Sequence, residues 1–571
     1  MKRITVLLLV STLICILVVW TGDIVESASA ASIYQSGATL YNGNDGSPSG
    51  NSSNMPKITL KGNSITFDGD GAIVDDSKIR ITSSGTYYIS GKLNNGQIIV
   101  NTKDKEAVNL VLNGVDITCF KGAPLYVINA AKTVITLPDG AKNYITDSNS
   151  YIPDDEELDE PNAAIFSDDD LTITGKGSLT IKANYNGIQT KDDLEIRGGN
   201  IAVNAVNDGI KGKDSVAVKD GNMIINAGGD GMQSNKIEDP DKGYVSIEGG
   251  TIKITAGRDG IQAETNLTIS GGSITISSGV ISDSDTNKKG TTTTGYGRAS
   301  VSTKGIKAGV DLIITGGTIN IDSVDDSIHS KNSIKINGGK MTLASGNDGI
   351  GSTSSIEING GDIDITKSYE GIESTVITIN NGNIHLVSRN DGINAFGYSS
   401  GVYGLNINGG YIVVDAYGDG IDINGYINMT GGMVIVSGPT SNWNGPLDYY
   451  SFDITGGFIV ASGSSGMAQP VGYGKSSTQY SVMIRLSWQE PGTMLHIKDE
   501  DGKEILTISP KKAYSSVAFC SPELQKDSTY TVYLGGCSTG ESTDGLYSGG
   551  IYTPGEQVAS FKISNAITYA R

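Results

Sequence analysis

The sequence predicts an all-β protein built as a right-handed parallel β-helix, with about 22 residues per rung and a small C-terminal β cap. A tripeptide of the type Asp-Gly-Ile recurs ten times between Asn186 and Ile421, most often at intervals of 22 residues. A Gly-Gly turn between two short apolar strands recurs with it, as at Gly316 and Gly338. Three strands per rung, each alternating inward apolar and outward polar residues, account for a repeat of this length.

Composition supports the all-β class and limits the partners. Glycine is frequent, at 77 residues, whereas only 3 residues are tryptophan, which suits short strands joined by tight turns better than long helices. The 62 acidic residues exceed the 42 basic ones and give a net charge of −20. A nucleic acid or an anionic membrane would be repelled, so we expect neither as a partner.

Residues 1–30 have the pattern of a signal peptide. Lys2 and Arg3 precede an apolar run from Ile4 to Trp20, and small residues up to Ala30 offer a cleavage site. This pattern predicts a secreted or cell-surface protein with no membrane contact beyond the export signal, and an uncleaved N-terminal anchor is the alternative. Residues 31–57 are rich in Gly, Ser and Asn and predict a flexible linker.

The folded part is predicted in three segments. Residues 58–165 carry strand patterns without the regular repeat, which indicates irregular N-terminal rungs and a cap. Residues 166–465 hold the regular β-helix. The repeat then stops, and strand patterns around a turn at Asp501 and Gly502 predict a C-terminal β subdomain over residues 466–571. We expect a monomer.

Two polar segments interrupt the repeat. Residues 153–160 carry six carboxylates, and a solvated loop is favoured there over a cation site. Residues 279–303 stand where a further tripeptide is due and predict a looped-out rung. They begin like an EF-hand loop, but Lys288 replaces the required Gly.

The cysteines and histidines give little chemistry. Cys15 lies in the signal, and of the other three cysteines only Cys520 and Cys537 are close enough in sequence to form a disulfide. The three histidines are too scattered for a zinc site.

The Asp of the tripeptide has two interpretations. In the structural one, Asp accepts hydrogen bonds from the backbone amides that follow and Gly takes a positive φ, so the pair makes a corner. In the other, the stacked carboxylates bind calcium, because neighbours ~4.8 Å apart repel by ~3.5 kcal/mol at an effective dielectric constant of about 20. The site is expected on the rungs with extra carboxylates, from Asp325 to Asp422. The candidate Ca²⁺ ligands are Asp208, Asp230, Asp259, Asp325, Asp326, Asp348, Glu370, Glu373, Asp391, Asp419 and Asp422.

Outward-pointing side chains near this row of carboxylates are candidates for binding a polysaccharide. Amides and amines suit sugar hydroxyls, and aromatic rings suit the faces of sugar rings. A solvated β surface or core packing is the alternative for each of them. The predicted carbohydrate-binding residues are Gln189, Lys211, Gln233, Gln262, Lys307, His329, Tyr398, Trp443 and Tyr449.

Lys213 and Lys331 are the candidate catalytic residues if the protein is a lyase. Beside calcium, such a lysine pairs with a uronate group or abstracts the proton next to the sugar carboxylate in a β-elimination. Surface lysines that keep the protein soluble are the simpler interpretation. The sequence holds no Ser-His-Asp arrangement, phosphate loop or dinucleotide fingerprint, while a paired-carboxylate glycosidase site is a further alternative.

Four segments resemble a known family. They are GGTIKITAGRDGIQAET (249–265), KSYEGIE (367–373), PNAAIF (161–166) and DGLYSGG (544–550), and they resemble a clostridial family of secreted, carbohydrate-binding β-helix proteins related to polysaccharide lyases. The resemblance extends over about residues 58–571 and implies a right-handed β-helix of the pectate-lyase type with calcium bound on it. It also implies binding to plant cell-wall polysaccharides, both cellulose and acidic, pectin-like glycans such as polygalacturonate. Asn186, Lys304 and Ser327 depart from the tripeptide, which implies weaker cation binding at their rungs.

These observations give one principal hypothesis and two rivals. We expect a secreted polysaccharide-binding protein that holds calcium on part of the acidic row and acts without catalysis. The first rival is a calcium-dependent pectate lyase that works by β-elimination. The second is a structural surface protein that binds neither glycan nor calcium.

Overall fold

A computed structural model describes residues 55–147, 161–280, 301–397 and 402–571. These residues form strands joined by turns and contain no helix, so the all-β prediction is confirmed for them. It follows that none of the described residues lies in a helix long and apolar enough to cross a membrane. The predicted signal, nearly all of the predicted linker, the acidic run at 153–160 and Tyr398 lie outside the described residues.

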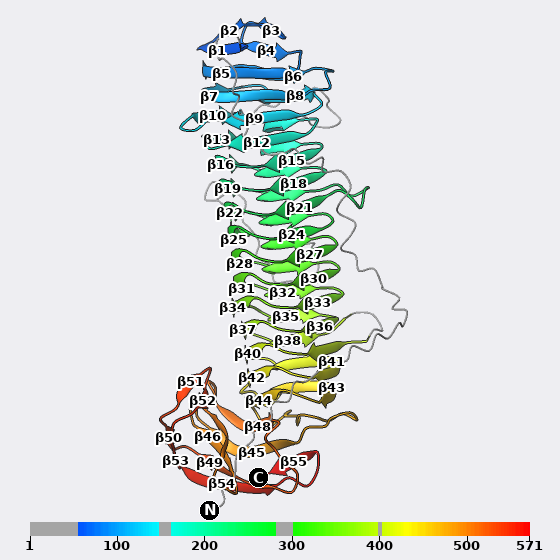
Figure 1. The fold of residues 1–571 in the computed structure, drawn as a ribbon, viewed down its shortest axis with the longest axis vertical. Helices are drawn as coiled ribbons and strands as arrows, with labels where there is room; N and C mark the ends of the chain where they lie inside the picture. The colour runs from blue at the N-terminus through cyan, green and yellow to red at the C-terminus, as the bar shows by residue number, and fades with distance from the viewer. Residues whose placement is uncertain (1–54, 148–160, 281–300, 398–401) are drawn as a thin grey trace, which may run out of the picture. The chain divides into compact units, whose positions relative to one another are not determined.

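The central part is a solenoid of three-stranded coils (Figure 1). One coil consists of β14 (Asn186–Thr190), β15 (Asp193–Ile196) and β16 (Asn200–Ala205). Each of these strands pairs in parallel with the strand three places further on, namely β17 (Ile210–Gly212), β18 (Ser215–Val218) and β19 (Asn222–Ala227). Repetition of this pairing gives three parallel sheets, which we call faces A, B and C.

Face A carries the Ile of the tripeptide on most of its strands. In stacking order, its strands include β4 (Lys78–Ile81), β6 (Gln97–Asn101), β8 (Leu125–Asn129), β11 (Ala163–Ser167), β14, β17, β20 (Met232–Ser234), β23 (Ile261–Ala263), β26 (Ile306–Ala308), β29 (Ile328–Ser330), β32 (Ile350–Ser352), β35 (Ile372–Ser374) and β38 (Ile393–Ala395).

Face B follows face A in each coil. In stacking order, its strands include β9 (Thr133–Leu137), β12 (Leu171–Gly175), β15, β18, β21 (Tyr244–Ile247), β24 (Leu267–Ile269), β27 (Asp311–Ile314), β30 (Ser333–Ile336), β33 (Ser355–Ile358), β36 (Val376–Ile379) and β39 (Gly404–Ile407). Two long strands, β41 (Ile421–Met429) and β43 (Leu447–Ile454), continue both face A and face B.

Face C closes each coil. In stacking order, its strands include β10 (Lys142–Thr146), β13 (Ser178–Ala183), β16, β19, β22 (Thr251–Ala256), β25 (Ser273–Ser278), β28 (Thr318–Ser323), β31 (Lys340–Ser345), β34 (Asp362–Lys367), β37 (Asn383–Ser388), β40 (Tyr411–Ala416), β42 (Met433–Ser437) and β44 (Phe458–Gly463). At the N-terminal end, β5 (Gly85–Leu93) and β7 (Val108–Thr118) pair in parallel, and β1 (Lys57–Gly62), β2 (Ile65–Asp68) and β3 (Ala72–Asp75) add antiparallel pairs.

The core is a column of stacked aliphatic side chains inside the coils. Ile188 pairs with Ile210 and Ile210 with Met232, and all three are fully buried. Each such side chain contributes about 1.5–3 kcal/mol by leaving water. The alternation of inward Ile with outward polar residues therefore holds the coils in register and fixes which side chains reach the outside of face A.

The two recurring glycines have different roles. In the Gly-Gly turn the second glycine has a positive φ, such as +91° at Gly317 and +100° at Gly339. The glycine of the tripeptide does not have a positive φ, so the predicted corner geometry was wrong. A Cβ at Gly349 would lie 2.7 Å from both the Gly371 carbonyl oxygen and the Ile365 side chain, so this glycine is needed for space between face A and the core.

The tripeptide residues Ile261 and Ile306 are 45 residues apart, close to two repeats, but this interval holds one coil rather than two. Ile261 pairs directly with Ile306, and a long connection leads from β25 to β26. The predicted looped-out segment, 279–303, falls in this connection, and its middle lies outside the described residues.

The C-terminal subdomain ends the parallel stacking. β48 (Tyr514–Cys520) pairs antiparallel with β44 and with β45 (Ser481–Gln489), which also pairs with β55 (Ile567–Ala570). The predicted hairpin at Gly502 joins β46 (Leu495–Asp499) to β47 (Glu504–Ile508). These two belong to a six-stranded sheet with β49 (Thr529–Leu534), β51 (Glu541–Thr543), β52 (Leu546–Ser548) and β54 (Glu556–Lys562), and β50 (Cys537–Ser538) pairs with β53 (Tyr552–Thr553). Cys520 is buried and Cys537 exposed, and both are free, so the disulfide considered from their spacing does not form.

Candidate cation and glycan site

A ladder of side chains runs along the start of the face A strands. Its members precede the inward Ile or Met by two residues and are Asn186, Asp208, Asp230, Asp259, Lys304, Asp326, Asp348, Glu370, Asp391 and Asp419. The backbone N–H of Asp208 donates to Oδ1 of Asn186, that of Asp230 to Asp208, and that of Asp259 to Asp230, each at 3.0 Å. The Asp therefore links two coils and does not cap the amides that follow it in its own coil.

In the first part of the ladder, from Asn186 to His329, the carboxylates have neutralising or hydrogen-bonding partners. In two coils the partner is the residue three positions after the ladder Asp: Lys211 lies 3.7 Å from Asp208, and Gln233 donates to Asp230 at 2.7 Å. Lys307, from the next coil, donates to Asp259 at 3.1 Å. We call this the compensated part. Five of the predicted carbohydrate-binding residues thus contact the ladder, namely Gln189, Lys211, Gln233, Lys307 and His329.

The doubled carboxylates Asp325 and Asp326 belong to this compensated part. Lys304 donates to Asp325 at 2.9 Å and to Asp326 at 2.5 Å, and His329 Nδ1 lies 2.8 Å from Asp326. Although burial raises the pKa of Asp326, the hydrogen bonds from His329 and the Lys304 charge hold that pKa well below its usual range. The Lys304 ammonium thus lies between the two carboxylates that were predicted to bind a calcium ion.

From Asp348 onward the ladder has no counter-charge. Among the described residues, no Lys, Arg or His makes an ion pair with Asp348, Glu370, Glu373, Asp391, Asp419, Asp422 or Asp448. Asp391 and Asp419 still accept the next coil's backbone N–H, at 2.7 Å and 2.5 Å. We call this region the uncompensated part.

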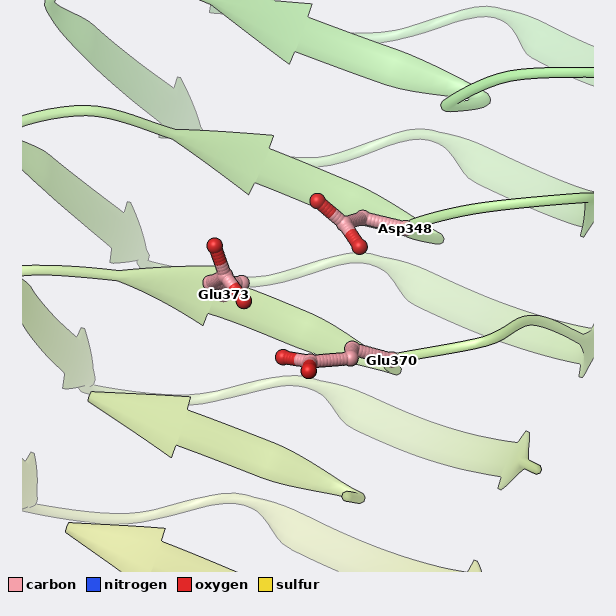
Figure 2. Close-up of side chains that lie close together, drawn as sticks. All are labelled: Asp348, Glu370 and Glu373. Atoms are coloured by element: carbon pink, nitrogen blue, oxygen red, sulfur yellow. The ribbon is translucent and has the colours of Figure 1, made fainter. Parts of the chain in front are cut away.

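Asp348, Glu370 and Glu373 form the closest carboxylate cluster of this part (Figure 2). One oxygen from each lies within 4.8 Å of the others, and Asp348 and Glu370 are each only 9% exposed. Burial and the neighbouring carboxylates raise the pKa of Asp348 to about 8. Burial and the contact with Glu370 raise the pKa of Glu373 to about 9. The three groups therefore resist ionising together.

The cluster also departs from the ladder's hydrogen bonding. Among the described residues, no backbone N–H donates to the Asp348 or Glu370 carboxylate. The preceding strand, β34, contains a β-bulge: Leu343 pairs with Ile365 but Ala344 with Lys367, so Thr366 is an extra residue. A bulge re-aims the chain that follows it, and Glu370 follows this one by four residues. The Glu370 carboxylate instead accepts from Asn394 at 2.6 Å and from Asn390 at 3.2 Å.

Gly351 places no side chain beside the cluster. It occupies the position at which other coils carry Lys, Gln or His, and a Cβ there would lie 3.0 Å from Asp348 Oδ2 and 3.6 Å from His329 Nδ1. The missing side chain explains why Asp348 has no partner of the Lys211 type.

The last coils add further carboxylates. Burial and neighbouring acids raise the pKa of Asp422 to about 7, and burial raises that of Asp391 to about 6. Asp448 pairs in register with Asp422 and extends the row. Sequence reasoning missed Asp448 because its coil begins with Pro446 and Leu447 in place of the tripeptide. The alignment of Leu447 with Ile421 is the signal that would have found it.

The predicted carbohydrate-binding residues differ widely in exposure. Trp443 is 88% exposed, whereas Gln189 is buried and its amide oxygen accepts from Asn186. Tyr449 is only 6% exposed, packs edge-on against Phe452 and donates its hydroxyl to the Pro470 carbonyl. Its selection as a surface residue was wrong, because inward and outward residues alternate along β43. Tyr450 points outward instead and is 84% exposed.

The two candidate lysines and Gln262 lie along the solenoid's outer surface. Lys213 and Lys331 are exposed, and Gln262 is half-buried. Lys213 follows β17, five coils before β32, which corresponds to about 24 Å along the solenoid. Lys331 follows β29, on the coil directly before that of Asp348. Only Lys331 therefore lies one coil from the carboxylate cluster.

Comparison with known proteins gives a consistent class. A family model described as "Carbohydrate-binding domain-containing protein" matches residues 75–349 and 344–449, which is more than half of the chain. A curated protein from Acetivibrio thermocellus with the same description is 47% identical over 148 residues, or 25% of this chain and 51% of that protein. The chain thus spans about half the length of the curated relative it matches.

A solved structure is also similar. It is described as the structure of the polysaccharide lyase-like protein from C. thermocellum, in a gadolinium derivative, and its sequence is 37% identical to this chain. The match covers 47% of this chain and 97% of that one, with a TM-score of 0.38.

Proposed function

The chain belongs to the family of carbohydrate-binding domain-containing proteins, and from this we propose that it is a secreted, non-catalytic polysaccharide-binding protein that holds acidic glycans through calcium. The observation that carries the proposal is the uncompensated cluster of Asp348, Glu370 and Glu373 on face A. The proposed acidic ligands of the protein are pectin-like chains such as polygalacturonate, and the proposed neutral ligand is cellulose.

The geometry of the cluster supports calcium. Calcium takes six to eight oxygen ligands at about 2.3–2.6 Å, so two ligands on opposite sides of the ion lie about 5 Å apart. The three carboxylate oxygens lie within 4.8 Å of one another, which suits one such ion. Three carboxylates leave several coordination positions for water or for oxygens of a sugar.

Electrostatics supports a bridging role for the ion. The protein carries a net charge of −20, so a polyuronate is repelled unless a cation lies between the two. A calcium ion in the cluster would neutralise Asp348, Glu370 and Glu373 and present positive charge to a uronate carboxylate. Binding of acidic glycans should therefore depend on calcium.

Exposed aromatic rings support binding of a neutral glycan. Trp443 and Tyr450 both present most of their surface to solvent on the coil of β43. Such rings stack on the apolar faces of pyranose units through dispersion and C–H to π contacts. Cellulose, a neutral chain of such units, is the ligand that this pair suits.

Affinity electrophoresis tests the proposal. Migration is measured in gels containing polygalacturonate, with calcium or with a chelator, for the wild type and for the double variant Glu370→Gln with Glu373→Gln. Glu357→Gln is the matched control, because Glu357 lies on face B and pairs with Lys335 at 3.2 Å. We expect calcium-dependent retardation of the wild type and of the control. The double variant should bind polygalacturonate about tenfold or more weakly. Equal retardation with and without chelator would contradict the proposal.

The lyase alternative rests on Lys331, which lies on the coil next to the cluster. Incubation with polygalacturonate and calcium distinguishes the two functions, because β-elimination produces unsaturated uronates that absorb in the ultraviolet. We expect no absorbance increase. An increase that Lys331→Ala abolishes would establish a lyase in place of a binding protein.

A further inference from the structure

A hollow of about 250 Å³ opens on face B, away from the carboxylate ladder. It crosses strands β12, β15, β18 and β21, at right angles to their direction. Thr172 lies at its floor and is only 2% exposed, and its hydroxyl oxygen has no hydrogen-bond partner among the described residues. A buried hydroxyl without a partner at the bottom of a polar hollow points to a ligand that supplies the missing hydrogen bond.

The hollow exists because small side chains interrupt the outward row of face B. Thr172, Glu195 and Ala217 are in register on successive strands, so the short side chains of Thr172 and Ala217 lie on both sides of Glu195. The next strands of this row carry Ser246 and Thr268, which are also short, and only then Ile313 and Lys335. Neither Ser246 nor Thr268 lines the hollow, whereas Thr172 and Ala217 do, so the hollow is limited to the coils on either side of Glu195.

Polar groups around the hollow are held in place by their neighbours. Asp193 accepts the Ser215 hydroxyl at 2.6 Å, and the Asp193 backbone N–H donates to Asp170 at 3.3 Å. Glu195 lies 2.8 Å from Arg197 and 3.9 Å from Lys132. These carboxylates keep free lone pairs in fixed positions, and acceptors of this kind bind the hydroxyl groups of a ligand without having to be ordered first.

We propose that this hollow is a second glycan subsite that takes one neutral pyranose unit of a polysaccharide chain. The carboxylates of Asp170, Asp193 and Glu195 accept sugar hydroxyls, Lys132 and Lys219 donate, and Tyr244 lines the side of the hollow. The volume is slightly below the range of about 300–1,000 Å³ typical of small-molecule sites, which limits the occupant to a single ring. Three carboxylates against two lysines disfavour a uronate.

The inference rests on the proposed carbohydrate function but needs no metal. The carboxylate cluster on face A and the hollow on face B would hold two different kinds of sugar residue. The expected ligand is a polysaccharide, or a wall mixture, that carries neutral as well as acidic units.

Isothermal titration with cellotetraose and mannotetraose in the presence of a chelator tests the subsite. Ala217→Arg fills the hollow without removing any of its polar groups. The matched control is Thr268→Arg, two strands further along the same row, at an exposed position outside the hollow. We expect at least one tetrasaccharide to bind the wild type and Thr268→Arg equally at a site that Ala217→Arg weakens at least tenfold. Binding at Trp443 and Tyr450 is separated from this site by repeating the titrations with Trp443→Ala and Tyr450→Ala added to each protein.

Thr172→Val is a second variant, nearly equal in shape, that removes only the unpartnered hydroxyl. We expect it to weaken the binding of the same tetrasaccharide about threefold or more and to leave the melting temperature of the protein unchanged. Absence of binding by both sugars to the wild type, or equal binding to Ala217→Arg and Thr268→Arg, would overturn the subsite.

Failure of the subsite and failure of the proposed function give different results. Calcium-dependent retardation in polygalacturonate should be unaffected by Ala217→Arg, whereas Glu370→Gln with Glu373→Gln should lose it and keep tetrasaccharide binding. Loss of both activities in either variant would overturn the assignment of two separate sites.

Discussion

The compensated and uncompensated parts of the ladder share one backbone but differ in charge. In both, an Asp can link two coils by accepting a backbone N–H, as Asp208 does from Asp230 and Asp391 does from Asp419. In the first part, Lys211, Lys304 and Lys307 offset the buried carboxylates. In the second, Gly351 and Glu373 stand where such partners would be. The link recurs in both parts although Asp348 and Glu370 lack it, whereas the charge of the partner residue differs between the two parts.

The difference shows where binding chemistry can arise in a repeat protein. A buried carboxylate without a partner is costly unless it is protonated or binds a cation. The compensated part meets this requirement inside the chain. The uncompensated part retains the cost, and a ligand cation that binds there gains the corresponding free energy. Removing or adding one internal cation should therefore convert one part into the other.

Removal of Lys304 should have the largest effect. Lys304→Met leaves Asp325 and Asp326 without their ammonium partner, and loss of one member of a buried ion pair typically costs about 3–5 kcal/mol in the free energy of unfolding. Urea unfolding at pH 7.5 in chelator measures this cost. Lys335→Met is the control, because its pair with Glu357 is half-exposed and worth about 0–1 kcal/mol.

Calcium sharpens this test. If Lys304 takes the place of a cation, calcium should stabilise Lys304→Met more than the wild type. Equal, small losses of stability in Lys304→Met and Lys335→Met would show that the two parts of the ladder do not differ in compensation.

Addition of a cation at Gly351 should have an intermediate effect. Gly351→Lys places an ammonium beside Asp348, where Lys211 lies beside Asp208, and should raise the free energy of unfolding in chelator by about 1–2 kcal/mol. It should also abolish the rise in melting temperature that calcium gives the wild type. Gly351→Met is the matched control, because it adds similar bulk without charge. The same gain in both variants would assign the effect to packing.

The pH dependence should have the smallest effect. The pKa values of Glu373 and Asp348, about 9 and about 8, exceed their unfolded values of about 4. Between these limits the two groups bind more protons in the folded than in the unfolded state, so their contribution to the free energy of unfolding is greatest below about pH 4 and falls as pH rises towards 9. Glu373→Gln should reduce the fall in the free energy of unfolding between pH 8 and 9 by about 1 kcal/mol, measured by urea unfolding with chelator.

Two comparisons check the source of that slope. Glu357→Gln should leave it in place, because side-chain hydrogen bonds from Asn359 and Lys335 lower the pKa of Glu357. Calcium should remove the fall, because metal binding requires ionised carboxylates and strengthens as pH rises. A slope that Glu373→Gln leaves unchanged would place the titrating groups elsewhere in the chain.

The stacked coils were predictable because the alternation of Ile with polar residues is determined locally. The carboxylate cluster was predictable in part, since Glu370 and Glu373 flank one Ile in the sequence. The pairing of Lys304 with Asp325 and Asp326 was not, because it joins adjacent coils. The tripeptide glycine was misjudged for a related reason. A need for space and a need for positive φ both select glycine, and only the facing Ile365 distinguishes them at Gly349.

The antiparallel strand β48 has a consequence for how such proteins diversify. A stack of parallel coils has no intrinsic length, and β48 terminates this one by pairing against β44. Each coil contacts only its neighbours, so duplication of a whole unit between the ends adds about 4.8 Å and leaves the cap unchanged. Copying the two coils that carry Asp348, Glu370 and Glu373 would duplicate the carboxylate cluster, and with it the proposed glycan site, in a single genetic step.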